Sequence, residues 1–350
     1  MADKNVLRLG LIGTGQMAAH YAQSWVSMPE VAFVAVSEVN AASRRKFINI
    51  CRGARRPEPR EFDDFRAMLI ACRDQLDAIY VCTPHSLHGE HGIAVVESGL
   101  DLLIEKPMVT TVAEAERLIA ARNQSRSTVV VAFQGALSPL ISDTRKRARA
   151  GEFGELLSVA GTIWENWASR YQGHWKQRMD LSGGGFMFDT GAHMMNTVCL
   201  LTDAECELVS ALMNNREHSV DIVCAVVGRL TTGALLNLNA AGDGPVGCAS
   251  HITFFYTRAI VRIDAWGAWR EITVAGAPAP REEAEILNNP LKSFLAIRAG
   301  RAENLSTGEA GLRFARLWDA IKASSAKNGE PVAIRPTIRG SEFRERANQL

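Results

Sequence analysis

The chain has 350 residues, 39 basic and 38 acidic side chains, and a formal net charge of +1 at pH 7. This length predicts two domains, because a single hydrophobic core rarely extends beyond about 250 residues. The balanced charge argues against a nucleic-acid partner, which would need a basic surface, and no run of about 18 apolar residues is present to cross a membrane.

The seven cysteines are scattered along the chain without any C-x-x-C pair. That pattern argues against a disulfide framework and against a zinc centre, so we predict no metal site. The first residues run directly into a strand-like segment and leave no room for a signal peptide. We therefore expect a cytoplasmic protein with reduced thiols.

Strand-like and helix-like segments alternate through residues 1–130, which predicts βα units and a parallel sheet. The short strands are apolar on both faces, as expected in the middle of such a sheet. The expected strands are 6–12, 31–36, 78–82, 101–104 and 129–133, and the expected helices are 16–28, 90–98 and 112–123. We predict an α/β Rossmann domain with a doubly wound parallel sheet.

The pattern changes in the second part of the chain, residues 131–350, where strands follow one another with short turns. It predicts an α+β domain with a large, open, mainly antiparallel sheet covered by helices. The expected strands are 156–164, 219–230, 234–239, 251–256 and 260–264, and the expected helices are 281–286, 291–299 and 308–324. We expect this domain to bind substrate and to form oligomers. The outer face of the sheet is expected to carry the alternating Ile252, Phe254, Val261 and Ile263.

A glycine-rich loop lies between the first expected strand and the first expected helix. Its sequence is Gly13-Thr14-Gly15-Gln16-Met17-Ala18. The first glycine permits a tight turn, the second lets the backbone approach a pyrophosphate, and the small Ala18 lets the helix pack on the strand. Amide groups at the start of the helix then face the phosphate charge. The loop predicts a dinucleotide-binding site.

Glu38 follows the second expected strand closely, about 20 residues beyond the loop. A carboxylate there accepts hydrogen bonds from the adenosine ribose hydroxyls and repels a 2′-phosphate, which favours NAD over NADP. Arg44 and Arg45 follow on the next helix, where exposed positions are expected. Either guanidinium could reach a 2′-phosphate, so NADP stays open.

Two further segments follow strand ends, where ligands bind in an open parallel sheet. They are Thr83-Pro84-His85-Ser86-Leu87-His88 and Glu105-Lys106-Pro107. Proline favours an extended conformation at the residue before it, which projects the Lys106 side chain into the cleft. From that position Lys106 can stabilise a developing alkoxide.

A third segment, Gly183 to His193, reads GGGFMFDTGAH in the second domain. Asp189 and His193 are four residues apart and would share one side of a helix. An imidazole can take the hydroxyl proton while a hydride leaves the carbon, so His193 suits the role of base. Asp189 would bind a neighbouring hydroxyl or orient the other two groups. We predict Lys106, Asp189 and His193 as catalytic residues.

These motifs, in this order and spacing, resemble the glucose–fructose oxidoreductase and inositol dehydrogenase (Gfo/Idh/MocA) family over nearly the whole chain. The resemblance implies that the Lys106–Pro107 bond is cis. It also implies that the nicotinamide side of the cofactor is bound by Thr83, Pro84, His85, His88, Glu105, Lys106, Gln134 and Trp175, the last beside a basic Lys176. The chain departs from the family pattern at Ala136, which replaces an arginine, and at Asn196, which replaces an acid.

The expected activity is an NAD-dependent dehydrogenase acting on one CH–OH group of a sugar, cyclitol or related polyol, as a homodimer or homotetramer. A second hypothesis is a glycosidase that uses bound NAD as a transient oxidant, as some relatives do. A third is a cofactor-sensing regulator that has lost its chemistry. The retention of Lys106, Asp189 and His193 argues against the regulator.

Overall fold

The computed structural model describes residues 6–245, 247–274, 277–278, 280–284 and 289–335. The chain forms two compact units. The first contains the described residues of 1–132 and 289–311, and the second those of 133–288 and 312–350. Among these residues, no helix is long and apolar enough to cross a membrane.

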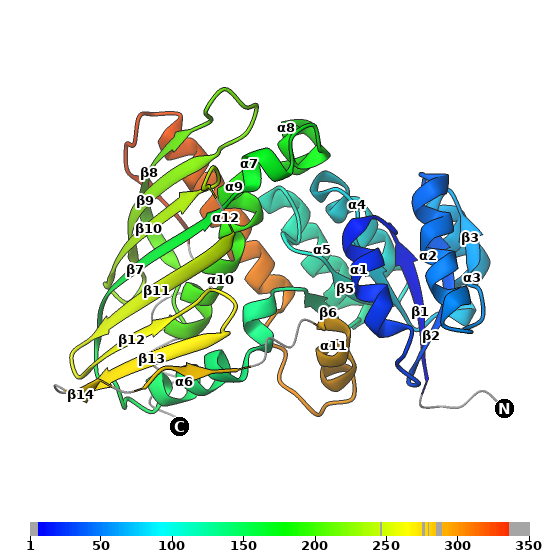
Figure 1. Ribbon diagram of the computed structural model, residues 1–350, viewed down its shortest axis with the longest axis horizontal. Helices are drawn as coiled ribbons and strands as arrows, with labels where there is room; N and C mark the ends of the chain where they lie inside the picture. Colours follow the sequence, from blue (N-terminus) through cyan, green and yellow to red (C-terminus); the bar gives the residue numbers. More distant parts are fainter. Residues whose placement is uncertain (1–5, 246, 275–276, 279, 285–288, 336–350) are drawn as a thin grey trace. The chain divides into compact units, whose positions relative to one another are not determined.

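The first unit is built on a six-stranded parallel sheet (Figure 1). Its strand order is β3-β2-β1-β4-β5-β6. In this doubly wound order, strands are added to one side of β1 first and then, from β4 on, to its other side. The strands are β1 (Leu7–Ile12), β2 (Val31–Ser37), β3 (Arg60–Phe62), β4 (Ala78–Val81), β5 (Asp101–Ile104) and β6 (Val129–Val131). The predicted Rossmann architecture is confirmed.

Helices cover both faces of this sheet. Trp25, Tyr21 and Phe47 pack with Leu291 and Phe294 of the returning segment in one buried core, which places α1, α2 and α11 on one face. Helices α4 and α5 pack together on β5 at the other face. The bounds are α1 (Gln16–Trp25), α2 (Ala41–Gly53), α3 (Phe65–Cys72), η1 (Arg73–Gln75), α4 (His85–Glu97), α5 (Val112–Ser125) and α11 (Pro290–Arg298).

The second unit contains a ten-stranded, mainly antiparallel sheet, as predicted. Its order is β14-β13-β12-β11-β7-β10-β9-β8-β16, with β15 paired to β13. One pair, β7 with β10, is parallel. The strands are β7 (Leu156–Glu165), β8 (Cys206–Asn214), β9 (Val223–Leu230), β10 (Leu235–Ala241), β11 (Cys248–Tyr256), β12 (Ala259–Ile263), β13 (Trp269–Val274), β14 (Ala277–Pro278), β15 (Glu282–Glu283) and β16 (Val332–Ala333).

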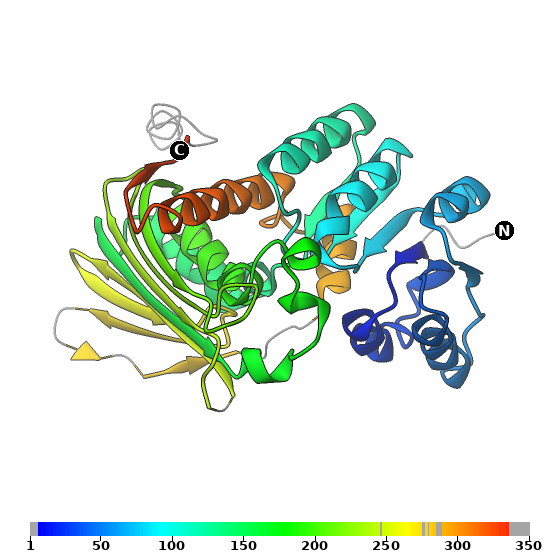
Figure 2. The same cartoon turned by 90° about the horizontal axis from the view of Figure 1, so that it is seen from above.

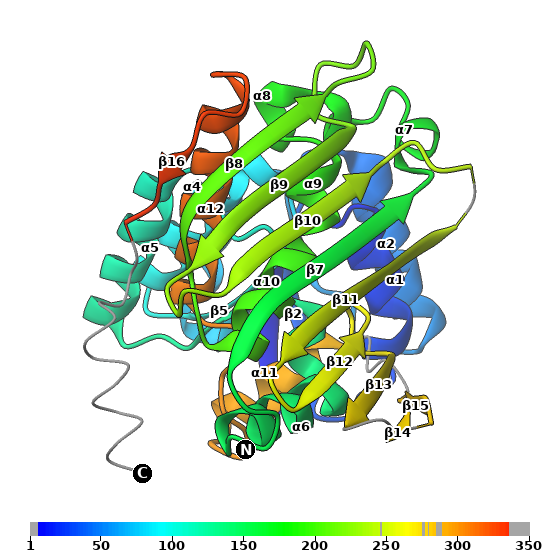
Figure 3. The same cartoon turned by 90° about the vertical axis from the view of Figure 1, so that its left-hand side faces the viewer.

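Helices lie on one face of this sheet and leave the other face open (Figures 2 and 3). Helix α10 (Gly191–Thr202) is buried from its first residue to Leu201. The other bounds are η2 (Gln134–Leu137), α6 (Pro139–Arg149), α7 (Trp167–Arg170), η3 (Trp175–Gln177), α8 (Met179–Ser182), α9 (Phe186–Asp189) and α12 (Gly308–Ser325).

The prediction of which apolar side chains lie on the outer face of the second sheet is wrong. Ile252, Phe254, Val261 and Ile263 are each 0% exposed and belong to the core. Alternation along a strand separates its two faces but does not reveal which face helices will cover. The exposed apolar side chains on the opposite face are Leu212, Val227, Leu235 and Ile260.

Two expected helices also differ. The prediction of a helix over 281–286 is wrong, because Glu282–Glu283 forms strand β15 beside β13. Residues 285 and 286 lie outside the described residues. The helix expected over 90–98 begins earlier, at His85, with Pro84 as its N-cap residue.

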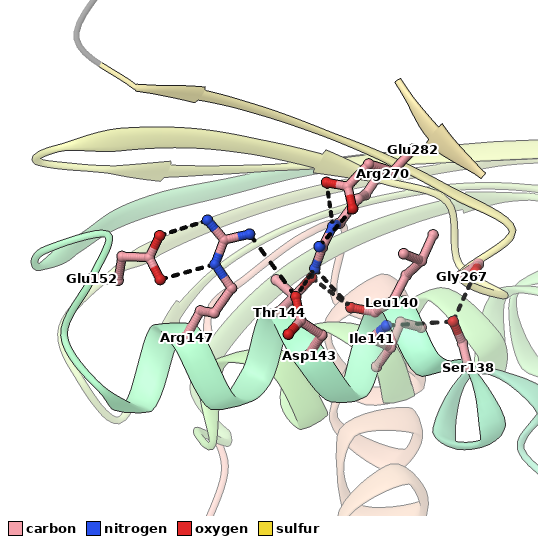
Figure 4. Close-up of polar contacts among 10 residues, drawn as sticks. All are labelled: Ser138, Leu140, Ile141, Asp143, Thr144, Arg147, Glu152, Gly267, Arg270 and Glu282. Carbon is pink, nitrogen blue, oxygen red and sulfur yellow. Dashed lines mark hydrogen bonds and ion pairs between the residues drawn. The ribbon is translucent and has the colours of Figure 1, made fainter. Parts of the chain in front are cut away.

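A buried arginine fastens α6 to the edge of the second sheet (Figure 4). Arg270 of β13 donates both to the Glu282 carboxylate, at 3.0 and 2.8 Å, and to the Asp143 carboxylate. It also donates to the Thr144 hydroxyl, at 3.1 Å. Its side chain is only 6% exposed, whereas both carboxylates are half exposed. Arg270 therefore supplies the cation that orders β15 and α6.

We predict that Arg270→Met lowers the free energy of unfolding of the second unit by about 2 kcal/mol, because its charged hydrogen bonds to Glu282, Asp143 and Thr144 are lost. The urea midpoint measures this change. Arg229→Met removes an exposed ion pair with Glu207 and is the matched control, expected to cost under about 1 kcal/mol. Equal midpoints for the two variants would contradict the role given to Arg270.

Candidate functional site

The phosphate loop follows β1 directly, at the carboxyl edge of the first sheet. Gly13 has φ +90°, and a Cβ at this position would overlap the Cys82 carbonyl. Helix α1 begins at Gln16, without a side-chain cap and without an acidic residue in its first turn. The Thr14 hydroxyl is 1% exposed and has no hydrogen-bond partner. An open helix N-terminus beside an unpartnered donor suits a phosphate group.

Glu38 lies beside this loop, immediately after β2. Its carboxylate accepts hydrogen bonds from the backbone amides of Thr14, at 2.9 Å, and Asn40, at 2.8 Å. Arg44 pairs with Glu61 at 3.0 Å and also donates to the Glu38 carbonyl. Arg45 is exposed. Glu38 thus presents a carboxylate next to the phosphate loop, and Arg44 is already engaged by neighbouring groups.

The segment after β4 carries Thr83, Pro84, His85 and His88. His88 is fully buried, with Nδ1 2.7 Å from the Pro107 carbonyl oxygen and Nε2 2.9 Å from that of Thr83. Burial lowers the pKa of His88, although both carbonyls oppose the shift. A neutral imidazole has one N–H and so donates to only one of these two oxygens. His88 therefore bridges the segments that follow β4 and β5.

The segment after β5 carries Glu105, Lys106 and Pro107. The Lys106–Pro107 bond is cis, as the resemblance implied. Glu105 is buried and accepts a hydrogen bond from the Tyr80 hydroxyl at 2.8 Å. Lys106 is half buried. The strand end is held in the core by Glu105, while Lys106 follows it at the carboxyl edge of the sheet.

In the second unit, Asp189 and His193 lie on two successive helices and not on one. Asp189 ends α9 and His193 lies in the first turn of α10, with Thr190 between the helices. The start of α9 is fixed by Asp221, whose carboxylate accepts from the amides of Gly185, at 2.6 Å, and Met187, at 2.8 Å. Burial raises the pKa of Asp221, although the hydrogen bonds from these two amides favour the charged form.

The Asp189 carboxylate is buried and strongly bound. Its Oδ2 accepts from Trp167 Nε1 at 2.9 Å and from Lys176 Nζ at 2.7 Å. The Lys176 ammonium also lies 4.4 Å from the centre of the Tyr171 ring. Burial alone would lower the pKa of Lys176, but Asp189 and Tyr171 raise it overall. Lys176 and Asp189 therefore form a charge pair inside the second unit.

Two aromatic rings flank the imidazole of His193. The Phe133 ring lies 6.4 Å away at 88°, and the Trp266 ring lies 5.6 Å away at 46°. Asn196 follows one turn later on α10; its side-chain amide is buried, and Nδ2 has no hydrogen-bond partner. Gln134 and Ala136 lie in η2, which packs against α10.

The predicted residues thus fall into two groups. The first unit holds the phosphate loop, Glu38, the two strand-end segments and Lys106, and the second holds Gln134, Trp175, Asp189 and His193. Trp175 is half buried, beside His174. Sequence reasoning missed Asp221 and Trp266, and it gave Lys176 no role apart from its neighbour Trp175. It considered Trp167 for stacking on a sugar or for the core, and the structure places it in the core, where it donates to Asp189. Among the described residues, no group of three or more His, Cys, Asp or Glu side chains could hold a metal ion.

Comparison with known families gives two matches. A family model described as "Oxidoreductase family, NAD-binding Rossmann fold" (GFO/IDH/MocA) matches residues 7–133. A model described as "GFO/IDH/MocA C-terminal domain" matches residues 141–262. Together the matches cover most of the chain and fall on both units.

Individual relatives are distant. A dTDP-3,4-didehydro-2,6-dideoxy-alpha-D-glucose 3-reductase from Actinomadura kijaniata is 28% identical over 66% of this chain and 66% of its own length. A glycosyl hydrolase family 109 protein from Bacteroides fragilis is 24% identical over 55% of this chain and 48% of its own. The chain thus matches less than two thirds of either relative.

Among solved structures, the aldose-aldose oxidoreductase from Caulobacter crescentus, complexed with glycerol, superposes with a TM-score of 0.81. It is 23% identical, with 94% of this chain and 100% of that chain covered. At this identity the likeness concerns the fold.

His91 yields a prediction of pH dependence. Its Nδ1 lies 3.0 Å from the Thr83 hydroxyl, and burial, followed by the charge of His88, lowers its pKa from 6.5 to about 4. Between pH 6.5 and about pH 4, His91 is therefore protonated in the unfolded chain but neutral in the folded protein. The free energy of unfolding consequently falls as the pH drops from 6.5 towards 4. The full effect is about 3 kcal/mol.

We expect His91→Gln to flatten this slope, measured as urea midpoints between pH 4 and pH 7. The exposed His20→Gln variant should keep the slope of the unsubstituted protein. A slope unchanged in His91→Gln would show that His91 does not titrate in this way.

Proposed function

Because the chain belongs to the GFO/IDH/MocA oxidoreductase family, whose N-terminal domain is an NAD-binding Rossmann fold, we propose that it is an NAD-dependent dehydrogenase. The proposed reaction moves a hydride between the nicotinamide and a secondary alcohol or ketone of a sugar, cyclitol or related polyol. The observation that carries it is the helix pair α9–α10, which holds a paired carboxylate, Asp189, four residues from a buried imidazole, His193.

The first unit would hold most of the cofactor. The phosphate loop faces the pyrophosphate with amide groups and the Thr14 hydroxyl, and Glu38 binds the adenosine ribose. NAD, when bound, accepts the hydride from the substrate carbon. The residues proposed to bind it are Gly13, Thr14, Gly15, Gln16, Met17, Glu38, Thr83, Pro84, His85, His88, Glu105, Lys106, Gln134 and Trp175.

Three side chains are proposed to act on the substrate oxygen and its neighbour. His193 takes the hydroxyl proton as the C–H bond breaks, and it returns the proton in the reverse direction. Lys106 donates a hydrogen bond to the same oxygen and stabilises its developing negative charge. Asp189, held by Trp167 and Lys176, binds an adjacent hydroxyl or orients the two other groups.

A glycosidase with transient oxidation is the second candidate, and the similarity to a glycosyl hydrolase family 109 protein supports it. Both reactions need the same hydride acceptor and the same proton acceptor. They differ in net redox change: a dehydrogenase changes the absorbance at 340 nm during turnover, and such a glycosidase does not. A screen of inositols, aldoses and glycosides at this wavelength, with product analysis, separates the two.

We also propose that the protein works as a homodimer or homotetramer in the cytoplasm. The open face of the second sheet exposes Leu212, Val227, Leu235 and Ile260, an apolar set that suits burial against another copy. All seven cysteines are thiols in the structure, as suits a reducing compartment. Light scattering of the purified protein tests the oligomeric state.

We predict that Lys106→Ala and His193→Ala each lower kcat by about 10² to 10⁴-fold, the usual contribution of a positioned acid or base. NAD binding, followed by fluorescence titration, should survive in both variants. Full activity in either variant would refute its catalytic role. Lost NAD binding in His193→Ala would reassign His193 to the cofactor site, and in Lys106→Ala it would show that Lys106 acts mainly through the cofactor.

For the cofactor, we expect NAD to bind more tightly than NADP in calorimetric titration, because the Glu38 carboxylate repels a 2′-phosphate. Glu38→Gln should reduce the ratio of the NADP to the NAD dissociation constant by about tenfold, equivalent to ~1.4 kcal/mol. Glu58→Gln removes an exposed carboxylate paired with Arg52 and should leave the preference unchanged. Tighter NADP binding by the unsubstituted protein would overturn the role of Glu38.

A further inference from the structure

Trp266 lies beside the proposed catalytic base and outside every sequence motif discussed above. Its ring is 5.6 Å from the imidazole of His193. Of the three rings in this group, Phe133 is 0% exposed and His193 is 7% exposed, whereas Trp266 is half buried. Trp266 therefore offers the aromatic surface that a ligand next to His193 can touch.

The turn that carries Trp266 is held on both sides of the residue. Ala265 donates its amide to the Ser250 hydroxyl at 2.8 Å, and its carbonyl accepts from the Thr197 hydroxyl at 2.8 Å. Thr197 lies one turn beyond His193 on α10. The turn is therefore fastened to the helix that carries the proposed base.

On the other side, the Gly267 carbonyl accepts from the Ser138 hydroxyl at 2.7 Å (Figure 4). Gly267 has φ +73°, and a Cβ there would overlap Ser138 Oγ. The Asp264 carboxylate closes the turn by accepting from the amide of Ala268 at 2.6 Å. The position of Trp266 is thus fixed by the fold before any ligand binds, which reduces the entropic cost of binding.

The other tryptophans near the proposed catalytic residues do not offer such a surface. Trp167 is 0% exposed and donates its indole N–H to Asp189. The ring of Trp175 packs against that of His174, at 5.4 Å, and Trp175 is already among the residues proposed to bind the cofactor. Trp164 of β7 packs against His251 of the neighbouring strand β11, with 6.0 Å between the ring centres.

We propose that Trp266 forms the apolar wall of a substrate subsite beside His193, and that this subsite takes a closed sugar or cyclitol ring. Such a ring carries C–H groups on its faces and hydroxyls at its rim. It can therefore cover the indole face while a rim hydroxyl meets the imidazole. The buried amide of Asn196, one turn from His193, adds a neutral polar group to the same helix face. An open-chain polyol must first lose rotational freedom to present a comparable surface. The inference rests on the proposed function and narrows its substrate class.

The first test compares Trp266→Ala and Trp266→Phe with myo-inositol and D-xylose as ring probes and sorbitol as the open-chain probe. We expect Trp266→Ala to raise KM for the ring substrates by about two- to tenfold, with a smaller rise in Trp266→Phe and unchanged NAD affinity. Trp269→Phe is the matched control, because this half-buried tryptophan lies on β13 and packs on Arg281 at 4.1 Å. An unchanged KM for rings, or an equal rise for sorbitol, overturns the proposal.

The second test measures binding without turnover, so that it stands even if no polyol is oxidised. Ring probes should quench the tryptophan fluorescence of the NADH-loaded protein, in which an alcohol cannot be oxidised, and Trp266→Phe should lose most of that change. Sorbitol should produce little quenching. If no ring probe binds, or if Trp266→Phe quenches like the unsubstituted protein, the subsite is refuted independently of the redox assignment.

Discussion

The second unit depends on a buried carboxylate at the start of α9. Asp221 accepts two backbone amides through its side chain and a third, that of Phe186, through its carbonyl at 2.8 Å. An unpaired carboxylate at this depth would be costly, so these donors hold it in one position. Because α9 leads directly into α10, the same contacts fix where Asp189 and His193 lie. The glycine run before α9 allows this close approach of two backbone segments.

Charge is balanced locally around Asp189. Lys176 and Trp167 both donate to the same oxygen, and Tyr171 faces the ammonium group. Burial that would lower the pKa of Lys176 is offset by the carboxylate, so the pair is more stable than either group alone. Pairing with Lys176 and Trp167 therefore holds the Asp189 carboxylate in one position at the end of α9, about one turn before His193 in the chain.

Features formed by residues that lie close together in the sequence were predictable. The phosphate loop, Glu38 and the strand ends around Thr83 and Lys106 follow from patterns of a few residues, and each lies at the carboxyl edge of the sheet as expected. Contacts between distant segments were not predictable: Asp221 is 36 residues from Gly185. The buried face of the second sheet was misassigned for the same reason, since helices that cover it come from separate parts of the chain.

Local motifs and long-range contacts support different parts of the proposed function, namely cofactor binding and substrate selection. Binding of the pyrophosphate and the adenosine ribose uses backbone amides and one carboxylate, which a local motif specifies. The proposed selection among polyols would instead depend on side chains such as Trp266, whose place beside His193 arises from the turn between β12 and β13 and its bonds to Ser138 and Thr197. Changes in that turn can alter the substrate while every recognisable motif stays intact.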